Sequence, residues 1–233
     1  MKIKLKQLPK LTAFLLEFRK YKSMPGGNEA SWNDLFPILT ERTSTTSFDT
    51  HYFYQDIWAF RKILESGVKE HVDVGSKVDY IGFLSTITSV TFIDIRPLVT
   101  DLPGINSRAG SILDMPYPDK SINSLSCLHV AEHIGLGRYG DPLDPLGTKK
   151  SCAELSRVLA PGGSLYFGLP IGRPRVCFNA HRVHSTGQIL EYFKGLELVE
   201  FSLVDDKGRF LQKVDPEKAK DQKYGCGLFH FRK

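Results

Sequence analysis

The chain has 233 residues, enough for one large domain with a short extension. Its apolar fraction of 41% and charged fraction of 24% are typical of a globular protein, and its net charge is only +5. No apolar run approaches the ~18–20 residues that cross a bilayer, and the basic start lacks the apolar stretch of a secretory signal. The four cysteines form no C-x-x-C pair, which argues against a disulfide framework or a zinc ribbon. We therefore expect a cytoplasmic protein.

Residues 1–45 are expected to form a helical extension ahead of a main domain, residues 46–233. Apolar residues recur at helical spacing from Leu11 to Phe18 and predict an amphipathic helix over about residues 10–22. Basic residues accompany it: Lys2, Lys4, Lys6, Lys10, Arg19, Lys20 and Lys22. The helix either packs on the domain with its lysines in solvent or makes a weak contact with a membrane surface. No nucleic-acid-binding motif is present, so we expect no nucleic-acid partner.

A second helical pattern covers about residues 50–66 and leads into a series of apolar runs that each end in a polar residue. The first run is a strand that ends near Asp73 and Gly75. A short helix follows, and a second strand over residues 90–94 ends at Asp94. This alternation of strand and helix is typical of βαβ units.

The series continues with Ser111–Asp114, which we interpret as the third apolar run, and with a fourth run over residues 122–129 that ends at His129. An amphipathic helix, a Pro-Gly-Gly turn at residues 161–163 and a short strand over residues 164–169 come next. The pattern predicts an α/β fold with a doubly wound parallel sheet. Ligands in such sheets bind outside the carboxyl ends of the strands, where the terminal polar residues would gather.

The order of these motifs resembles that of the Rossmann-like S-adenosylmethionine-dependent methyltransferases. More narrowly, the chain resembles a little-characterised family known as a domain of unknown function, DUF268, over roughly residues 45–233. The residues that carry the narrow resemblance are Asp49-Thr-His-Tyr-Phe-Tyr-Gln55-Asp-Ile-Trp58, Glu132-His-Ile-Gly-Leu-Gly-Arg-Tyr-Gly-Asp141-Pro, Phe178-Asn-Ala-His181-Arg182, Val204-Asp-Asp206 and Tyr224-Gly-Cys-Gly-Leu-Phe229. The resemblance implies a mostly parallel seven-stranded sheet, closed by an antiparallel hairpin of residues 196–205 and 224–231.

The resemblance also implies S-adenosyl-L-methionine as the cofactor. The turn at Gly75 would contact its methionine part, Asp94 its ribose hydroxyls, and Asp114 with Met115 its adenine. His129 would lie near the transferable methyl group. The complete set of residues expected to bind the cofactor is Gln55, Asp73, Gly75, Ser76, Asp94, Ile95, Arg96, Asp114, Met115 and His129.

The chain departs from the family pattern at Lys77 and Asp79, where further glycines are usual. A dinucleotide needs such a glycine because the backbone must touch its pyrophosphate. S-adenosylmethionine has no phosphate, so a phosphate-cradling loop is unnecessary. The sequence has no G-x-x-x-x-G-K-[ST] run, which argues against a P-loop NTPase.

Transfer of a methyl group to a hydroxyl needs positioning and a general base, and histidine has a suitable unperturbed pKa. We expect His133, His181 or Asp141 to act as this base, although each could instead hold a loop by hydrogen bonding. The residues expected to bind the acceptor are Tyr54, Arg138, Tyr139, Asn179 and Arg182. Asp141 and its acidic neighbours match no defined metal motif, so we expect no metal.

Three functional hypotheses follow. The first is a methyltransferase acting on a small molecule or glycan, with O-methylation of a sugar hydroxyl in bacterial surface polysaccharide synthesis as its most specific form. The second is a non-catalytic Rossmann-like binding module that has lost its cofactor, which the residues at 77 and 79 favour. The third is an NAD-dependent oxidoreductase, against which the missing G-x-G-x-x-G argues.

Overall fold

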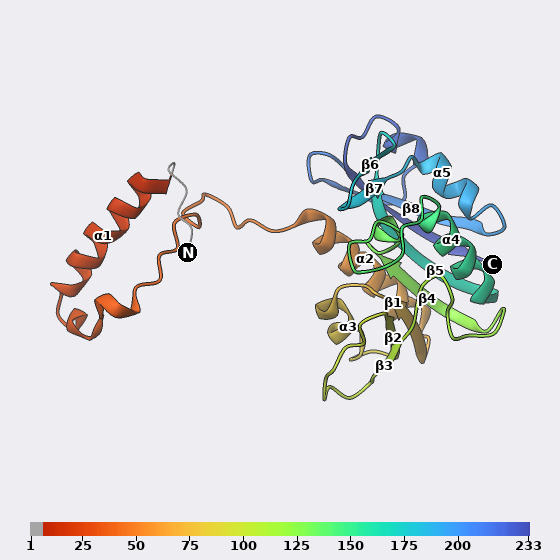
Figure 1. Ribbon diagram of the computed structural model, residues 1–233, viewed down its shortest axis with the longest axis horizontal. Coiled ribbons are helices and arrows are strands. Elements are labelled where there is room, and N and C mark those ends of the chain that lie inside the picture. Colours follow the sequence, from red (N-terminus) through yellow and green to blue (C-terminus); the bar gives the residue numbers. More distant parts are fainter. Residues whose placement is uncertain (1–6) are drawn as a thin grey trace. The chain divides into compact units, whose positions relative to one another are not determined.

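The computed structural model describes residues 7–233, and the chain divides into two compact units, Met1–Phe48 and Asp49–Lys233 (Figure 1). Among the described residues, no helix is both long and apolar enough to cross a membrane.

The first unit is built around α1 (Leu8–Lys22), followed by the short 3-10 helices η2 (Gly27–Glu29) and η3 (Trp32–Asp34). Phe18 on α1 packs edge-on against Trp32 with ring centroids 4.6 Å apart. The predicted helix is therefore confirmed. Its contact with a membrane surface stays a prediction, and Lys2, Lys4 and Lys6 lie outside the described residues.

The second unit alternates strands and helices along the chain. Its helical elements are α2 (Thr50–Ser66), α3 (Val78–Leu84), η4 (Ala131–His133), α4 (Gly147–Val158), α5 (Thr186–Tyr192) and η5 (Pro216–Ala219). Its strands are β1 (Glu70–Val74), β2 (Ser89–Asp94), β3 (Ile105–Ala109), β4 (Ile122–Leu128), β5 (Leu159–Ile171), β6 (Arg175–Cys177), β7 (His181–Val183), β8 (Glu197–Val204), β9 (Phe210–Leu211) and β10 (Gly225–Arg232).

Eight strands form the main sheet in the order β3-β2-β1-β4-β5-β10-β8-β9, and β6 pairs with β7 in a separate hairpin. The strands from β3 to β5 are parallel, whereas β10 runs antiparallel between β5 and β8. The predicted α/β fold with an antiparallel C-terminal hairpin is thus confirmed. The sheet has one strand more than the seven expected, because the two residues of β9 pair with β8 at its edge.

Both faces of the sheet are covered, as a doubly wound fold requires. Helices α4 and α5 pack with one face of the sheet in the larger apolar cluster. Helices α2 and α3 pack on the opposite face (Figure 1). Helix α2 begins at Thr50 because the Asp49 carboxylate accepts the backbone N–H groups of His51 and Tyr52, at 3.0 and 3.2 Å. This cap places His51 in the first turn of the helix.

The third strand lies earlier than predicted. Residues 105–109 form β3, whereas Ser111 and Asp114 close a tight turn. The expectation was wrong because β3 is an edge strand whose residues are mostly polar and partly exposed, so it carries little apolar signal. The apolar Ile112 instead enters the core from the turn.

The predicted Pro-Gly-Gly turn is a bulge inside β5. Ile122 on β4 pairs with Leu159 and Ser124 pairs with Ser164, so residues 160–163 loop out opposite a single residue. Gly162 has a φ of +77°, which explains the glycine at this position.

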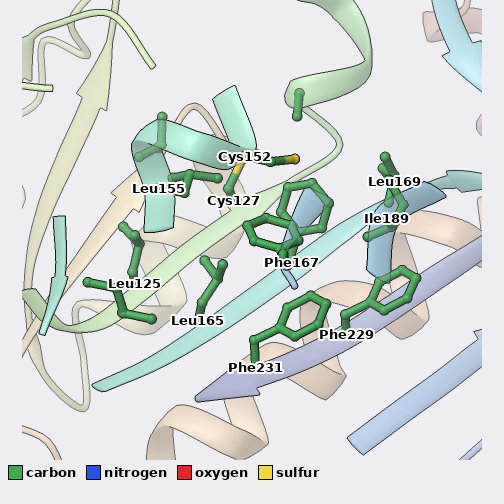
Figure 2. Packing of buried hydrophobic residues seen from close by; sticks show 14 of the residues in the cluster. Leu125, Cys127, Cys152, Leu155, Leu165, Phe167, Leu169, Ile189, Phe229 and Phe231 are labelled. Atoms are coloured by element: carbon green, nitrogen blue, oxygen red, sulfur yellow. The ribbon is translucent and has the colours of Figure 1, made fainter. Parts of the chain in front are cut away.

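The core on the α4 side is centred on aromatic residues of β5 and β10 (Figure 2). Phe167 packs edge-on against Phe193 at 5.0 Å, and Phe229 lies parallel to Phe231 at 5.6 Å. The side chains of Phe167 and Phe229 are completely buried. Phe193, directly after α5, also packs against Phe231 at 4.7 Å and so contacts both β5 and β10 on this face of the sheet.

We expect Phe229→Ala to lower the free energy of unfolding by about 3–5 kcal/mol, because it leaves a cavity in this core. The matched control is Phe83→Ala on α3, where the side chain is 69% exposed and the loss should stay below about 0.5 kcal/mol. Urea unfolding measures both values, and equal losses in the two variants would contradict the core assigned here.

Candidate functional site

Two adjoining cavities open at the carboxyl edge of the parallel strands. The first, of about 530 Å³, has four histidines in its wall and is called here the histidine cavity. The second, of about 400 Å³, contains the end of β2 and is called the Asp94 cavity. Gly75, His129, His133 and Tyr139 line both cavities. Volumes of this size are typical of small-molecule sites.

The Asp94 cavity has a carboxylate at the end of β2. Asp94 Oδ1 accepts the backbone N–H of Arg96 at 2.7 Å, and the Arg96 guanidinium lies 3.6 Å from the same oxygen. Asp94 Oδ2 accepts no hydrogen bond from the residues that the structure describes. The turn of residues 110–113 forms another part of the wall. A bound hydroxyl group could therefore donate to Oδ2.

Gly75 separates the two cavities at the end of β1. Its φ is +65°, and a Cβ there would lie 3.2 Å from Val130 and 3.5 Å from Asp94 Oδ2. Only glycine combines this backbone conformation with the space beside the carboxylate. The glycine thus keeps the junction between the cavities open.

Asp73, which was expected to contact the cofactor, lines neither cavity. Its buried carboxylate accepts the backbone N–H of Ser76 at 3.0 Å, the Ser76 hydroxyl at 2.7 Å and the Ser126 hydroxyl. Burial nevertheless raises the pKa of Asp73 to about 7. In this arrangement Asp73 and Ser76 order the turn, and their direct contact with a cofactor stays a prediction.

The missing glycines at 77 and 79 cause no strain. Lys77 occupies the N-cap position of α3 with an ordinary φ of −62°, and Asp79 lies in the first helical turn. A carboxylate there suits the positive end of the helix dipole, and it also pairs with Lys77 at 3.1 Å. The turn therefore needs a glycine only at position 75.

Two of the proposed bases, His133 and His181, line the histidine cavity. His133 Nδ1 donates to the carbonyl of Ala180 at 2.6 Å, since a carbonyl can only accept, and this leaves a lone pair on Nε2. Burial lowers the pKa of His133 to about 4 and also lowers that of His181, so both rings are neutral near pH 7. Arg138 and Tyr139, proposed to contact the acceptor, lie in the same wall.

His129 follows β4 with a φ of +55°, which is rare for a residue other than glycine. Its Nδ1 is hydrogen-bonded to the buried side-chain oxygen of Gln55 on α2. Gly168 on β5 makes room for this contact, because a Cβ there would lie 2.8 Å from the Gln55 oxygen. The ring of His129 is thus held in one orientation at the junction of the cavities.

From the sequence, Glu132 is only one of several possible metal ligands and is not among the predicted site residues. Its side chain is fully buried in the wall of the histidine cavity, and neither carboxylate oxygen has a hydrogen-bond partner among the described residues. Its Oε1 lies 3.6 Å from Nε2 of His133, a ring that is neutral near pH 7. Burial raises the pKa of Glu132 to about 8. Glu132 belongs to one of the sequence motifs that carry the family resemblance, which singled it out. Only the fold shows that its carboxylate lacks a hydrogen-bond partner among the described residues.

The remaining predicted residues are divided between the cavities and other parts of the fold. Ile95, Arg96 and Asp141 line the Asp94 cavity, and Gln55, Asp114, Met115, Tyr54, Asn179 and Arg182 line neither cavity. Burial alone would raise the pKa of Asp141, but backbone N–H groups, including those of Gly135 and Tyr139, hold it below its usual range. Arg182 donates to the carbonyls of Ile134 and Asp144. Both residues therefore order the loop after η4, and their roles in chemistry stay predictions.

Solved structures with the same architecture define the class of fold. The N-methyltransferase NodS from Bradyrhizobium japonicum WM9, in complex with S-adenosyl-L-homocysteine, is 16% identical with a TM-score of 0.54, over 93% of this chain and 96% of that one. A putative sarcosine dimethylglycine methyltransferase from Galdieria sulphuraria is 17% identical with a TM-score of 0.53, over 77% and 85%. The [4+2]-cyclase SpnF is 16% identical with a TM-score of 0.53, over 76% and 80%. The protein has the Rossmann-like fold of S-adenosylmethionine-dependent methyltransferases.

Residues 117–224 match the family described as "Caenorhabditis protein of unknown function, DUF268". The resemblance inferred from the sequence motifs is thereby confirmed over this segment, which contains Glu132, His133 and His181. No significant match to a curated protein sequence is found.

The buried Glu132 carboxyl group, which has no hydrogen-bond partner among the described residues, predicts a specific pH dependence of stability. The folded state holds the Glu132 proton up to about pH 8, whereas a glutamate in the unfolded chain releases it near pH 4.3. The free energy of unfolding therefore falls as the pH rises from about 4.3 to about 8. Glu132→Gln has no carboxyl group to ionise, so this part of the fall disappears. Relative to the parent, E132Q should gain on the order of 2 kcal/mol between pH 6 and pH 8.

Urea unfolding at the two pH values measures this gain. The control is Glu191→Gln, whose side chain is 68% exposed and paired only with Lys194. If E132Q and the parent show the same pH dependence, Glu132 is not the strained carboxylate described here.

Proposed function

We propose that the protein is an S-adenosylmethionine-dependent methyltransferase that acts on a small molecule or a glycan. The observation that supports it best is the pair of cavities that meet at Gly75 and His129. A transfer reaction needs a donor and an acceptor held next to each other, and two adjoining cavities at the carboxyl edge of the sheet offer this arrangement.

The residues of the Asp94 cavity fit the nucleoside end of the cofactor. Asp94 Oδ2 is available to accept from a ribose hydroxyl, and the turn after β3 offers a mixed apolar and backbone surface for adenine. Lys77 and Tyr52 line the histidine cavity next to Gly75. The Lys77 ammonium group suits the carboxylate of the cofactor's methionine part, and the Tyr52 ring suits a cationic group beside it. When bound, S-adenosylmethionine supplies a methyl group on a sulfonium cation.

The residues of the histidine cavity suit a polar acceptor. Three neutral imidazoles, from His51, His133 and His181, are accompanied by the Arg138 guanidinium and the Tyr139 ring. Such groups can hydrogen-bond several hydroxyls, as a sugar presents them. His181 and His133 can each take the proton that an acceptor hydroxyl loses during transfer. O-methylation of a sugar in bacterial surface polysaccharide synthesis is the most specific form of the proposal.

The fold by itself leaves a second candidate, a non-catalytic Rossmann-like binding module that has lost its cofactor. The likeness to SpnF, a [4+2]-cyclase, supports it only in that this architecture is not restricted to proteins described as methyltransferases. Calorimetric titration with S-adenosylmethionine, S-adenosylhomocysteine and NAD distinguishes the candidates. Binding of the first two but not of NAD supports the proposal, whereas binding of none by a folded sample contradicts it.

We expect Asp94→Ala to weaken S-adenosylmethionine binding about 10–150-fold, because hydrogen bonds to a charged group contribute ~1.5–3 kcal/mol. The control is Asp101→Ala, an exposed carboxylate that lines neither cavity. Isothermal titration calorimetry gives both affinities. Unchanged affinity in D94A would remove Asp94 from the cofactor site.

We expect His181→Ala to lower turnover about 10²–10⁴-fold while cofactor affinity stays within a few fold, because a general base acts in the transition state. His181→Gln retains hydrogen bonding without the basicity and should lose as much. Turnover with an identified acceptor and binding of S-adenosylhomocysteine are measured on the same samples. Parental turnover in either variant would exclude His181 as the base.

A further inference from the structure

Three side chains with metal-binding atoms lie together beside the histidine cavity, and two of them, His51 and His129, line its wall. His51 comes from the first turn of α2, His129 from the end of β4 and Cys226 from β10. One ligand atom of each lies within 4.8 Å of the other two. His51 and Cys226 belong to sequence motifs that carry the family resemblance. The proposed function gives Cys226 no role and His51 only a hydrogen bond to the acceptor.

The hydrogen bonds of His129 leave it prepared for a ligand. Gln55 Nε2 donates to Asp56 at 3.2 Å, which fixes the orientation of the Gln55 amide. The Gln55 oxygen faces His129 Nδ1 and can only accept, so Nδ1 carries the proton and Nε2 keeps its lone pair. A histidine whose second nitrogen is held by a buried polar partner is typical of metal sites.

His51 is held by aromatic and backbone neighbours. Its ring stacks on Tyr224 with centroids 5.3 Å apart and lies 5.7 Å from the His129 ring. One of its ring nitrogens lies within 4.8 Å of a ligand atom of each of the other two side chains and can offer a lone pair to a shared cation. Cys226 is fully buried beside these rings as a free thiol.

Glu132 gives an independent indication of a bound cation. Its buried carboxylate lines the same cavity without a hydrogen-bond partner among the described residues, and its Oε1 lies 3.6 Å from Nε2 of His133. Two cationic side chains also line this cavity. Lys77 is paired with Asp79, and Arg138 donates to Ala180. An ionised carboxylate in this position is stabilised by a positive charge inside the cavity.

We propose that His51, His129 and Cys226 bind one divalent cation of the zinc type, with a fourth position open toward the histidine cavity. Two imidazoles and a thiolate suit Zn²⁺, whereas Mg²⁺ and Ca²⁺ prefer oxygen ligands. Ligand atoms around a tetrahedral Zn²⁺ lie roughly 3.4–3.7 Å apart, so binding draws the three side chains together by about 1 Å.

Binding exchanges a proton for the metal. The S–H bond of Cys226 breaks, a bond from sulfur to Zn²⁺ forms, and the proton leaves to the buffer. Two neutral imidazoles, one thiolate and Zn²⁺ carry a net charge of +1, which the Glu132 carboxylate balances. A water or hydroxyl ligand in the open position would have a lowered pKa and would lie beside a carboxylate able to take its proton.

The experiment is a Co²⁺ titration of the metal-free full-length chain, followed by absorption spectroscopy. We expect one equivalent of Co²⁺ to give the intense visible bands of a tetrahedral site and a near-ultraviolet charge-transfer band from the thiolate. Zn²⁺ should abolish both. The measurement needs neither cofactor nor acceptor, so it can fail or succeed independently of the proposed methyl transfer.

Three variants test the ligand set. Cys226→Ser should lose the charge-transfer band, and His51→Ala should keep it but bind more than about 100-fold more weakly, since loss of an outer partner alone costs 10–100-fold. The control, Cys152→Ser, changes an equally buried cysteine on α4 and should bind like the parent. Circular dichroism and thermal unfolding establish that each variant is folded.

The proposal is overturned if the folded parent gives no tetrahedral cobalt spectrum. A charge-transfer band that persists in folded C226S, or Co²⁺ affinity unchanged in folded H51A, would equally overturn it. Because H51A alters a partly exposed side chain at a helix end, it provides a test even if C226S fails to fold.

Discussion

The site depends on one buried hydrogen-bond network at the end of β1. The Asp73 carboxylate accepts from Ser76 and from Ser126 on β4, and the Ser76 hydroxyl accepts the backbone N–H of Leu128 at 3.1 Å. These bonds tie the turn that contains Gly75 to the end of β4, immediately before His129. Without them, the two cavities would share no fixed wall. Asp73 therefore holds the backbone of the turn that separates the two cavities.

Around this network the protein places polar groups where burial costs free energy. Glu132 has no hydrogen-bond partner among the described residues, and His129 adopts a backbone conformation that favours glycine. Packing elsewhere compensates for these costs, above all the aromatic core of β5 and β10 (Figure 2). Strained and unpaired groups concentrated in one cavity are typical of a functional site, because selection for stability alone would remove them.

Architecture and chemistry are separate properties of this fold. A methyltransferase and a [4+2]-cyclase share it at similar TM-scores and at identities near 16%. The chemistry open to this chain depends on the side chains along its strand ends, in particular Asp94 in one cavity and Glu132 with its neighbouring histidines in the other. The proposed donor and acceptor sides follow from those residues and not from the fold.

The sequence by itself determined the α/β class, α2, the strands β1, β2 and β4, and the C-terminal hairpin, because apolar periodicity and turn residues act over short distances. It also singled out Asp94, His133 and His181, but only Asp94 ends a strand, since His133 ends η4 and His181 begins β7. Only the tertiary structure decided where the polar edge strand β3 lies and that Asp73 points into the fold. It alone brought His51, His129 and Cys226 together, since contacts between distant segments depend on side-chain direction and strand register, which local patterns do not encode.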